Sequence, residues 1–151
     1  MKGEMEMRVV RTGLYVVVGG LGYGLIEVIW RGRTHWTMLA LGGVCFLVMG
    51  GINRRVKRRA PRYALCALSV TALELLTGCL VNLGLGWAVW DYSARRFNLW
   101  GQICPLYSFL WLLLSIPVCA LATRMDRLAP QLAERLKEMR PLPMNPSRQK
   151  Q

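Results

Sequence analysis

Two glutamates, Glu27 and Glu74, lie inside long apolar stretches of the sequence. An ionisable side chain in the middle of a bilayer-spanning helix costs about 2.5–3.5 kcal/mol on insertion scales, so such a group needs a function or a partner. Glu74 has no basic neighbour on its own stretch, and burial favours the neutral form of a carboxyl group. It could carry a proton, bind a cationic group, or hydrogen-bond across a helix bundle to Tyr23 or Tyr107 and fix the packing.

Each glutamate belongs to a stripe of small and polar residues at helical spacing. The stripes consist of Thr71, Glu74, Gly78 and Asn82, and of Gly20, Tyr23, Gly24, Glu27 and Arg31. Such stripes face other helices and not lipid, and Gly20 and Gly24 permit close helix contact. Glu27 and Arg31 are four residues apart, which suits an ion pair one turn apart. The sequence therefore predicts that the two stripes face each other around a polar pocket.

The segment at residues 90–102 is dense in aromatic and polar groups and is the most informative connection between apolar stretches. Loops with such residues are where binding tends to occur. The candidate ligand-binding residues are Glu27, Arg31, His35, Glu74, Asn82, Trp90, Asp91, Tyr92, Asn98 and Gln102. Two simpler interpretations stay open: Asp91 and Ser93 cap a turn, and His35 is an interfacial anchor beside Trp36. We expect no metal site and no cofactor.

Four stretches are long and apolar enough to span a membrane as helices: residues 12–30, 36–52, 63–87 and 103–123. Several Trp and Tyr residues lie near their ends, where amphipathic rings favour the headgroup region. The sequence predicts an all-α, polytopic membrane protein with a four-helix transmembrane domain at residues 1–123. Residues 124–140 are predicted to form a cytoplasmic amphipathic helix that carries Leu128, Leu132 and Leu136 on one face, and residues 141–151 a disordered tail.

The basic residues predict the orientation of these spans. Of the 20 Lys and Arg residues, 16 lie in the N-terminal segment, the loop at residues 53–62 and the C-terminal segment, and four lie on the other side. The positive-inside rule then places both termini in the cytoplasm, in a multi-pass protein of the cell membrane. The basic run between Arg54 and Arg62 is interpreted as a topology anchor at the lipid headgroups, and we expect no nucleic-acid partner.

Three motifs in the second half resemble the family labelled putative ABC-transporter type IV, or CmpB-like. They are Glu-Leu-Leu-Thr-Gly from Glu74, Trp-Asp-Tyr-Ser from Trp90, and Phe-Asn-Leu-Trp-Gly-Gln-Ile-Cys from Phe97. The resemblance covers about residues 72–117 and extends to residues 22–27. It implies a polytopic, permease-like component, and it marks the matching positions as candidates: Glu27, Glu74, Trp90, Asp91, Tyr92, Asn98, Gly101 and Gln102.

The preferred interpretation is a small transport-associated membrane protein that binds a small polar or cationic ligand, or a lipid headgroup, in an outward-facing polar pocket. One alternative is an intramembrane lipid-modifying enzyme with Glu74 as general acid or base, although no ATPase motif or nucleophile–base pair is visible. The other is a structural or regulatory subunit without a ligand. A complete transporter would need a second copy or a partner subunit, and the glycines at positions 42, 43, 50 and 51 suit such a contact.

Overall fold

The computed structural model describes residues 2–138, and this part of the chain is helical with connecting loops and contains no strand. The elements are α1 (Lys2–Arg31), α2 (Trp36–Arg55), α3 (Arg59–Gly78), the π-helical turn η1 (Cys79–Gly84) and α4 (Pro105–Glu138). Four helical segments, α3 being taken together with η1, are long and apolar enough to cross a membrane. The predicted all-α architecture with four membrane spans is confirmed.

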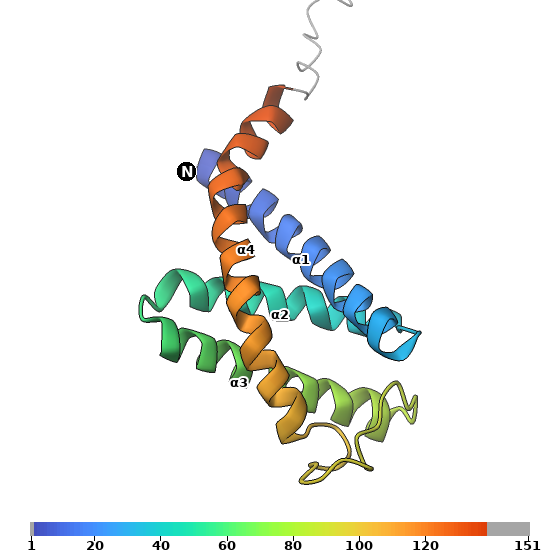
Figure 1. Ribbon diagram of the computed structural model, residues 1–151. Coiled ribbons are helices and arrows are strands. Elements are labelled where there is room, and N and C mark those ends of the chain that lie inside the picture. The colour runs from blue at the N-terminus through green and yellow to red at the C-terminus, as the bar shows by residue number, and fades with distance from the viewer. Residues whose placement is uncertain (1, 139–151) are drawn as a thin grey trace, which may run out of the picture.

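The connections and the helix ends lie at two ends of the bundle (Figure 1). The first, named the terminal end, holds the start of α1, the short α2–α3 turn and the end of α4. The second, named the loop end, holds the turn between α1 and α2 and the long connection at residues 85–104. The candidate site residues other than Glu74 lie at or near the loop end.

α1 and α2 pack at close range because glycines remove the side chains that would separate them. A Cβ atom built on Gly19 would lie 2.6 Å from the carbonyl oxygen of Gly42, and one on Gly20 would lie 2.7 Å from that of Leu39. A Cβ atom on Gly24 would lie 2.7 Å from a methyl group of Leu39. A larger residue at Gly19 or Gly20 would push the two backbones apart, whereas at Gly24 it would have to displace the Leu39 side chain. The predicted contact face through Gly20 and Gly24 is confirmed.

The glycine surface of α2 contacts α1 of the same chain. A Cβ atom on Gly42, Gly43 or Gly50 would meet Tyr23, Val16 or Tyr15, respectively, whereas one on Gly51 would have no neighbour within 4 Å. The sequence predicts this surface for a second subunit, and for three of its four glycines that prediction is wrong. The periodicity of the glycines reveals a close helix contact but not whether the other helix belongs to the same chain.

α3 ends at Gly78, and the chain continues as the π-helical turn η1 from Cys79 to Gly84. The amide of Leu85 donates to the carbonyl oxygen of Leu80, and the amide of Trp87 donates to that of Val81. The sequence predicts a regular helix as far as residue 87, because nothing in this apolar stretch marks the wider turn. Such turns are rare and are frequent near functional sites.

α4 continues past the predicted end of the fourth span and includes Pro117 and Pro130 without interruption. The segment predicted as an amphipathic helix is therefore helical to Glu138 and continuous with the span, and its location on a membrane surface stays a prediction. The Nζ atom of Lys137 lies 3.7 Å from a carboxylate oxygen of Glu6, which joins the end of α4 to the start of α1. The tail predicted at residues 141–151 lies outside the described residues.

A buried tyrosine joins three helices near the terminal end. The hydroxyl of Tyr15 in α1 donates to Oδ1 of Asp126 in α4 at 2.9 Å, and Arg54 in α2 lies 3.4 Å from the same oxygen. The amide of Asn53 donates to the hydroxyl of Thr123 at 3.0 Å. These contacts hold α1, α2 and α4 together at the end of the bundle opposite the candidate site.

Candidate functional site

Glu74 lies in the middle of the bundle and is 2% exposed. Its two carboxylate oxygens accept hydrogen bonds from two different helices: the Tyr23 hydroxyl of α1 donates to Oε1 at 2.8 Å, and the Trp111 indole of α4 donates to Oε2 at 2.7 Å. The rings of Tyr23 and Trp111 stack with their centres 5.4 Å apart. The prediction that Glu74 faces other helices is confirmed, and its partner is Tyr23 and not Tyr107.

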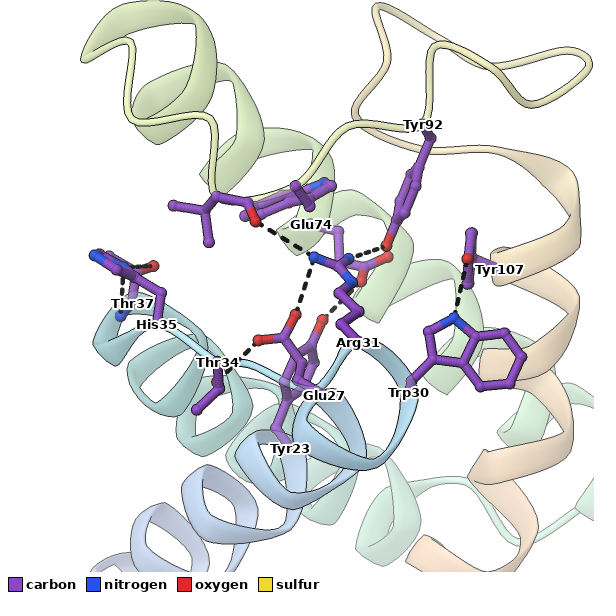
Figure 2. Close-up of polar contacts among 12 residues, drawn as sticks. Tyr23, Glu27, Trp30, Arg31, Thr34, His35, Thr37, Glu74, Tyr92 and Tyr107 are labelled. Atoms are coloured by element: carbon purple, nitrogen blue, oxygen red, sulfur yellow. Dashed lines mark hydrogen bonds and ion pairs between the residues drawn. The ribbon is translucent and has the colours of Figure 1, made fainter.

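Glu27 is 6% exposed and forms the predicted ion pair with Arg31, with 3.3 Å between Oε1 and Nη1. Its second oxygen accepts a hydrogen bond from the hydroxyl of Thr34 at 2.9 Å. Figure 2 shows Arg31 between Glu27 and the long loop, with Tyr23 and Glu74 close by. The two stripes therefore meet, because Tyr23 of the first stripe binds Glu74 of the second.

Arg31 also connects α1 to the long loop. Its guanidinium group donates to the hydroxyl of Tyr92 at 3.0 Å and to the carbonyl oxygen of Val89 at 3.4 Å. Burial raises the pKa of Tyr92, so its phenol stays protonated at neutral pH and accepts from Arg31 as a neutral hydroxyl. The charge of Arg31 is thus shared by one carboxylate and two neutral oxygens.

Three aromatic rings lie beside Arg31 (Figure 2). Tyr92 stacks on Tyr107 of α4 with ring centres 4.3 Å apart. The indole nitrogen of Trp30 in α1 donates to the hydroxyl of Tyr107 at 3.2 Å, and this hydrogen bond is exposed. It joins α1 to α4 near the loop end.

A cavity of about 420 Å³ lies between α1 and α4, and these rings form part of its lining. The residues with charged, hydroxyl or indole groups that line it are Glu27, Arg31, Tyr92, Tyr107, Tyr23, Trp30 and Trp111. The remainder consists of Ile26, Leu110, Leu113, Leu114 and Pro117. Glu74 is not part of the lining; it holds the two rings, Tyr23 and Trp111, that form the inner wall. We call this cavity the α1–α4 groove.

Asn82, Trp90 and Gln102 form a hydrogen-bonded unit that shapes the long loop. The amide of Asn82 donates to the side-chain oxygen of Gln102 at 2.7 Å and to the carbonyl oxygen of Trp90 at 3.0 Å. Its own oxygen accepts from the amide of Val89 at 2.8 Å, and the indole of Trp90 donates to the carbonyl oxygen of Gln102 at 3.0 Å. These three residues therefore position Val89 and Tyr92 beside Arg31.

Asp91 and Asn98 stabilise turns in the exposed part of the loop. Asp91 accepts hydrogen bonds from the amide of Ser93 at 2.8 Å and from its hydroxyl, and these bonds lower the pKa of Asp91. The side chain of Asn98 donates to the carbonyl oxygen of Arg95 at 2.8 Å and accepts from the amide of Gly101 at 2.9 Å. Gly101 has a φ of +70°, so the glycine of the third motif satisfies a backbone requirement.

His35 precedes α2 and caps it. Its Nδ1 atom lies 2.8 Å from the hydroxyl of Thr37 and accepts from the Thr37 amide at 3.4 Å, and its ring packs against those of Trp36 and Trp87, which also contact each other. It also lines a cavity of about 210 Å³ next to Glu27 and Arg31. Within residues 2–138, no group of three or more His, Cys, Asp or Glu side chains is placed to hold a metal ion.

The structure thus brings three of the predicted residues, Glu27, Arg31 and Tyr92, to one cavity and places Glu74 behind its wall. Trp30 and Trp111 are not among the site residues predicted from the sequence. Trp111 lies seven residues into α4, deeper than the interfacial position that tryptophan prefers. This unusual depth is the sequence feature that could have marked Trp111 as a site residue.

A family model described as putative ABC-transporter type IV matches residues 2–142 of the chain. The chain belongs to this family. The match includes all four helices and both stripes, so it extends well beyond the motifs that carried the resemblance. Membership and the four apolar helices fit a membrane protein associated with transport. No curated protein and no solved structure matches the chain.

Proposed function

We propose that this member of the putative ABC-transporter type IV family binds an amphipathic molecule, with the polar part at the loop end and the apolar part in the α1–α4 groove. The observation that carries the proposal is the composition of this groove. The cavity of about 420 Å³ has a mostly apolar surface; Glu27, Arg31, Tyr92 and Tyr107 line its loop-end side, and Leu113, Leu114 and Pro117 lie farther along α4. A volume of this size is within the range of small-molecule sites.

The groove borders the surface that would face lipid. Ile26 of α1 is 40% exposed, and Leu113 of α4 is 48% exposed, and both line the cavity. On a helix in a bilayer, exposed apolar side chains contact acyl chains. A ligand that carries an acyl chain could therefore enter sideways from the membrane without crossing water.

The distribution of basic residues supports an orientation with the terminal end in the cytoplasm. Of the 17 Lys and Arg residues within residues 2–138, 13 belong to the segments of the terminal end. The loop end and the polar part of the groove would then lie on the opposite side of the membrane. We further propose that a complete transport activity requires a second copy or a partner subunit, since one bundle of four helices encloses little volume.

Filling the apolar part of the groove tests the proposed function. Leu114→Trp is expected to reduce the fraction of purified protein that retains a lipid, measured by native mass spectrometry from mild detergent. Loss of space for two or three methylene groups, each worth about 0.8 kcal/mol, predicts a drop of about tenfold or more in affinity. The matched control is Leu106→Trp, because Leu106 is exposed on the same helix and lines none of the cavities described here.

Equal lipid retention in the wild type and in both variants, with unchanged folding, would contradict ligand binding in the groove. It would favour a second candidate, a structural subunit without a ligand. The observation behind this candidate is that both oxygens of Glu74 are already paired inside the bundle. The same enclosure supports neither proton transfer by Glu74 nor its use as a general acid on a substrate in the groove, because Tyr23 and Trp111 stand between them.

Chemical labelling tests the orientation. Arg96 lies in the exposed part of the long loop, and Lys57 lies in the exposed turn between α2 and α3. In intact cells, a membrane-impermeant maleimide is expected to label Arg96→Cys but not Lys57→Cys. After the membrane is permeabilised, it is expected to label Lys57→Cys as well. The wild-type chain gives the background from its five native cysteines. The reverse pattern would show that the terminal end is outside.

A further inference from the structure

Arg31 lies where three cavities of the loop end meet. It lines the α1–α4 groove, the cavity of about 210 Å³ beside His35, and a third cavity of about 330 Å³. The third cavity, which we call the upper cavity, shares four residues with the groove: Trp30, Arg31, Tyr92 and Tyr107. One molecule could therefore occupy both spaces, with its polar part in the upper cavity and its chain in the groove.

The upper cavity is rich in arginine. Arg33 and Arg95 line it together with Arg31, and both are exposed. Neither Arg33 nor Arg95 forms an ion pair with another described residue. Two carboxylates lie nearby: Glu27 pairs with Arg31 and accepts from Thr34, and Asp91, which also lines the upper cavity, accepts hydrogen bonds from Ser93. Three arginines against one lining carboxylate leave a net positive charge around this cavity, which would attract an anion.

The location of these arginines is unusual for the chain. Of the 17 Lys and Arg residues within residues 2–138, four belong to the loop end, and three of the four line the upper cavity. The positive-inside rule does not account for basic residues on this side, so a different role explains them better. Arg96, the fourth, lines none of the cavities described here.

We propose that the upper cavity binds the phosphate group of a phospholipid, held by Arg31, Arg33 and Arg95, while one acyl chain lies in the α1–α4 groove. A guanidinium group matches the geometry of phosphate oxygens with two parallel hydrogen bonds. The proposal rests on the proposed function, because it identifies the polar part of the amphipathic ligand. It assigns the arginines a binding role that the groove alone does not require.

The test compares short-chain phosphatidylglycerol, the diacylglycerol with the same chains, and inorganic phosphate. Each is titrated against the full-length protein in detergent, and binding is measured by native mass spectrometry for the two lipids and by calorimetry for all three. The wild type is expected to bind phosphatidylglycerol about tenfold or more tightly than diacylglycerol and to bind inorganic phosphate much more weakly.

The variant Arg33→Ala/Arg95→Ala is expected to lose this preference, with affinity for phosphatidylglycerol reduced about tenfold. Both side chains are exposed, so folding should be unchanged, which thermal unfolding checks. The matched control Arg96→Ala is expected to bind like the wild type, because it removes the same charge from the same loop without touching the cavity.

The possible results separate the two proposals. Equal affinity for phosphatidylglycerol and diacylglycerol, or an unaffected double variant, would overturn the phosphate site and leave the groove intact. An equal loss in Arg96→Ala would also overturn it, since the effect would then be one of net charge. Inorganic phosphate that binds as tightly as the lipid would overturn the assignment to a phospholipid. If neither lipid binds, the proposed function itself fails.

Discussion

Replacing Glu74 by alanine is expected to lower the free energy of unfolding of the full-length protein in mixed micelles by about 3 kcal/mol. The substitution leaves two buried donors, the Tyr23 hydroxyl and the Trp111 indole, without their acceptor. Interhelical hydrogen bonds in membrane proteins are worth about 0.6–1.7 kcal/mol each. The space vacated by the side chain adds a further cost for lost packing contacts.

Glutamine at this position provides the graded comparison. Glu74→Gln keeps the volume and one acceptor oxygen, but its amide nitrogen donates and so cannot receive the second hydrogen bond. The expected loss is about 1–2 kcal/mol. In a double-mutant cycle with Tyr23→Phe, which removes one donor, the two losses should be less than additive. Fully additive losses, or an alanine variant as stable as the wild type, would contradict the view that Glu74 holds the inner wall of the groove.

Two glycines on α2 are expected to respond to alanine with opposite signs. A Cβ atom at Gly42 would overlap the Cβ of Tyr23 and lie 2.6 Å from the carbonyl oxygen of Gly19, and neither atom is the flexible end of a side chain. Overpacking of this kind costs about 1–3 kcal/mol, which exceeds the gain of up to about 1 kcal/mol in helix propensity. Gly42→Ala is therefore expected to destabilise the protein by about 2 kcal/mol.

Gly51→Ala is the matched control, because a Cβ atom at Gly51 would have no neighbour within 4 Å. It is expected to leave stability unchanged or to raise it by up to about 1 kcal/mol. Equilibrium unfolding of the two variants and the wild type under the same conditions provides the measurement. If Gly42→Ala were as stable as Gly51→Ala, α1 and α2 could not pack as closely as described.

The features that follow from solvation cost were predictable from the sequence. A carboxyl group facing acyl chains is too unfavourable, so Glu27 and Glu74 had to face inward, and both are buried. The ion pair of Glu27 and Arg31 was also predictable, because residues four apart are neighbours on a helix. Apolar length predicted the four spans, although the true ends of α1 and α4 lie beyond the apolar stretches since helices continue into charged sequence.

Features that depend on a specific partner could not be predicted in this way. An asparagine or glutamine in a loop can bind a ligand or a backbone carbonyl, and composition does not distinguish the two. Asn82 and Gln102 bind each other and the loop backbone, so they act on the groove through Val89 and Tyr92. Trp111 was overlooked for a similar reason: its role depends on Glu74, which is 37 residues away in the sequence.

The contacts that join α1 to α4 differ in exposure along the bundle. Near the terminal end, the Tyr15 hydroxyl is buried against Ala122 and Asp126; in the middle, Tyr23 and Trp111 share Glu74; at the loop end, the hydrogen bond from Trp30 to Tyr107 is exposed. Water can replace an exposed hydrogen bond at little cost, whereas the other two contacts are buried or partly buried and are replaced less easily. The two helices are therefore expected to separate first at Trp30, at the loop end, while the contacts of Tyr15 keep them together near the terminal end.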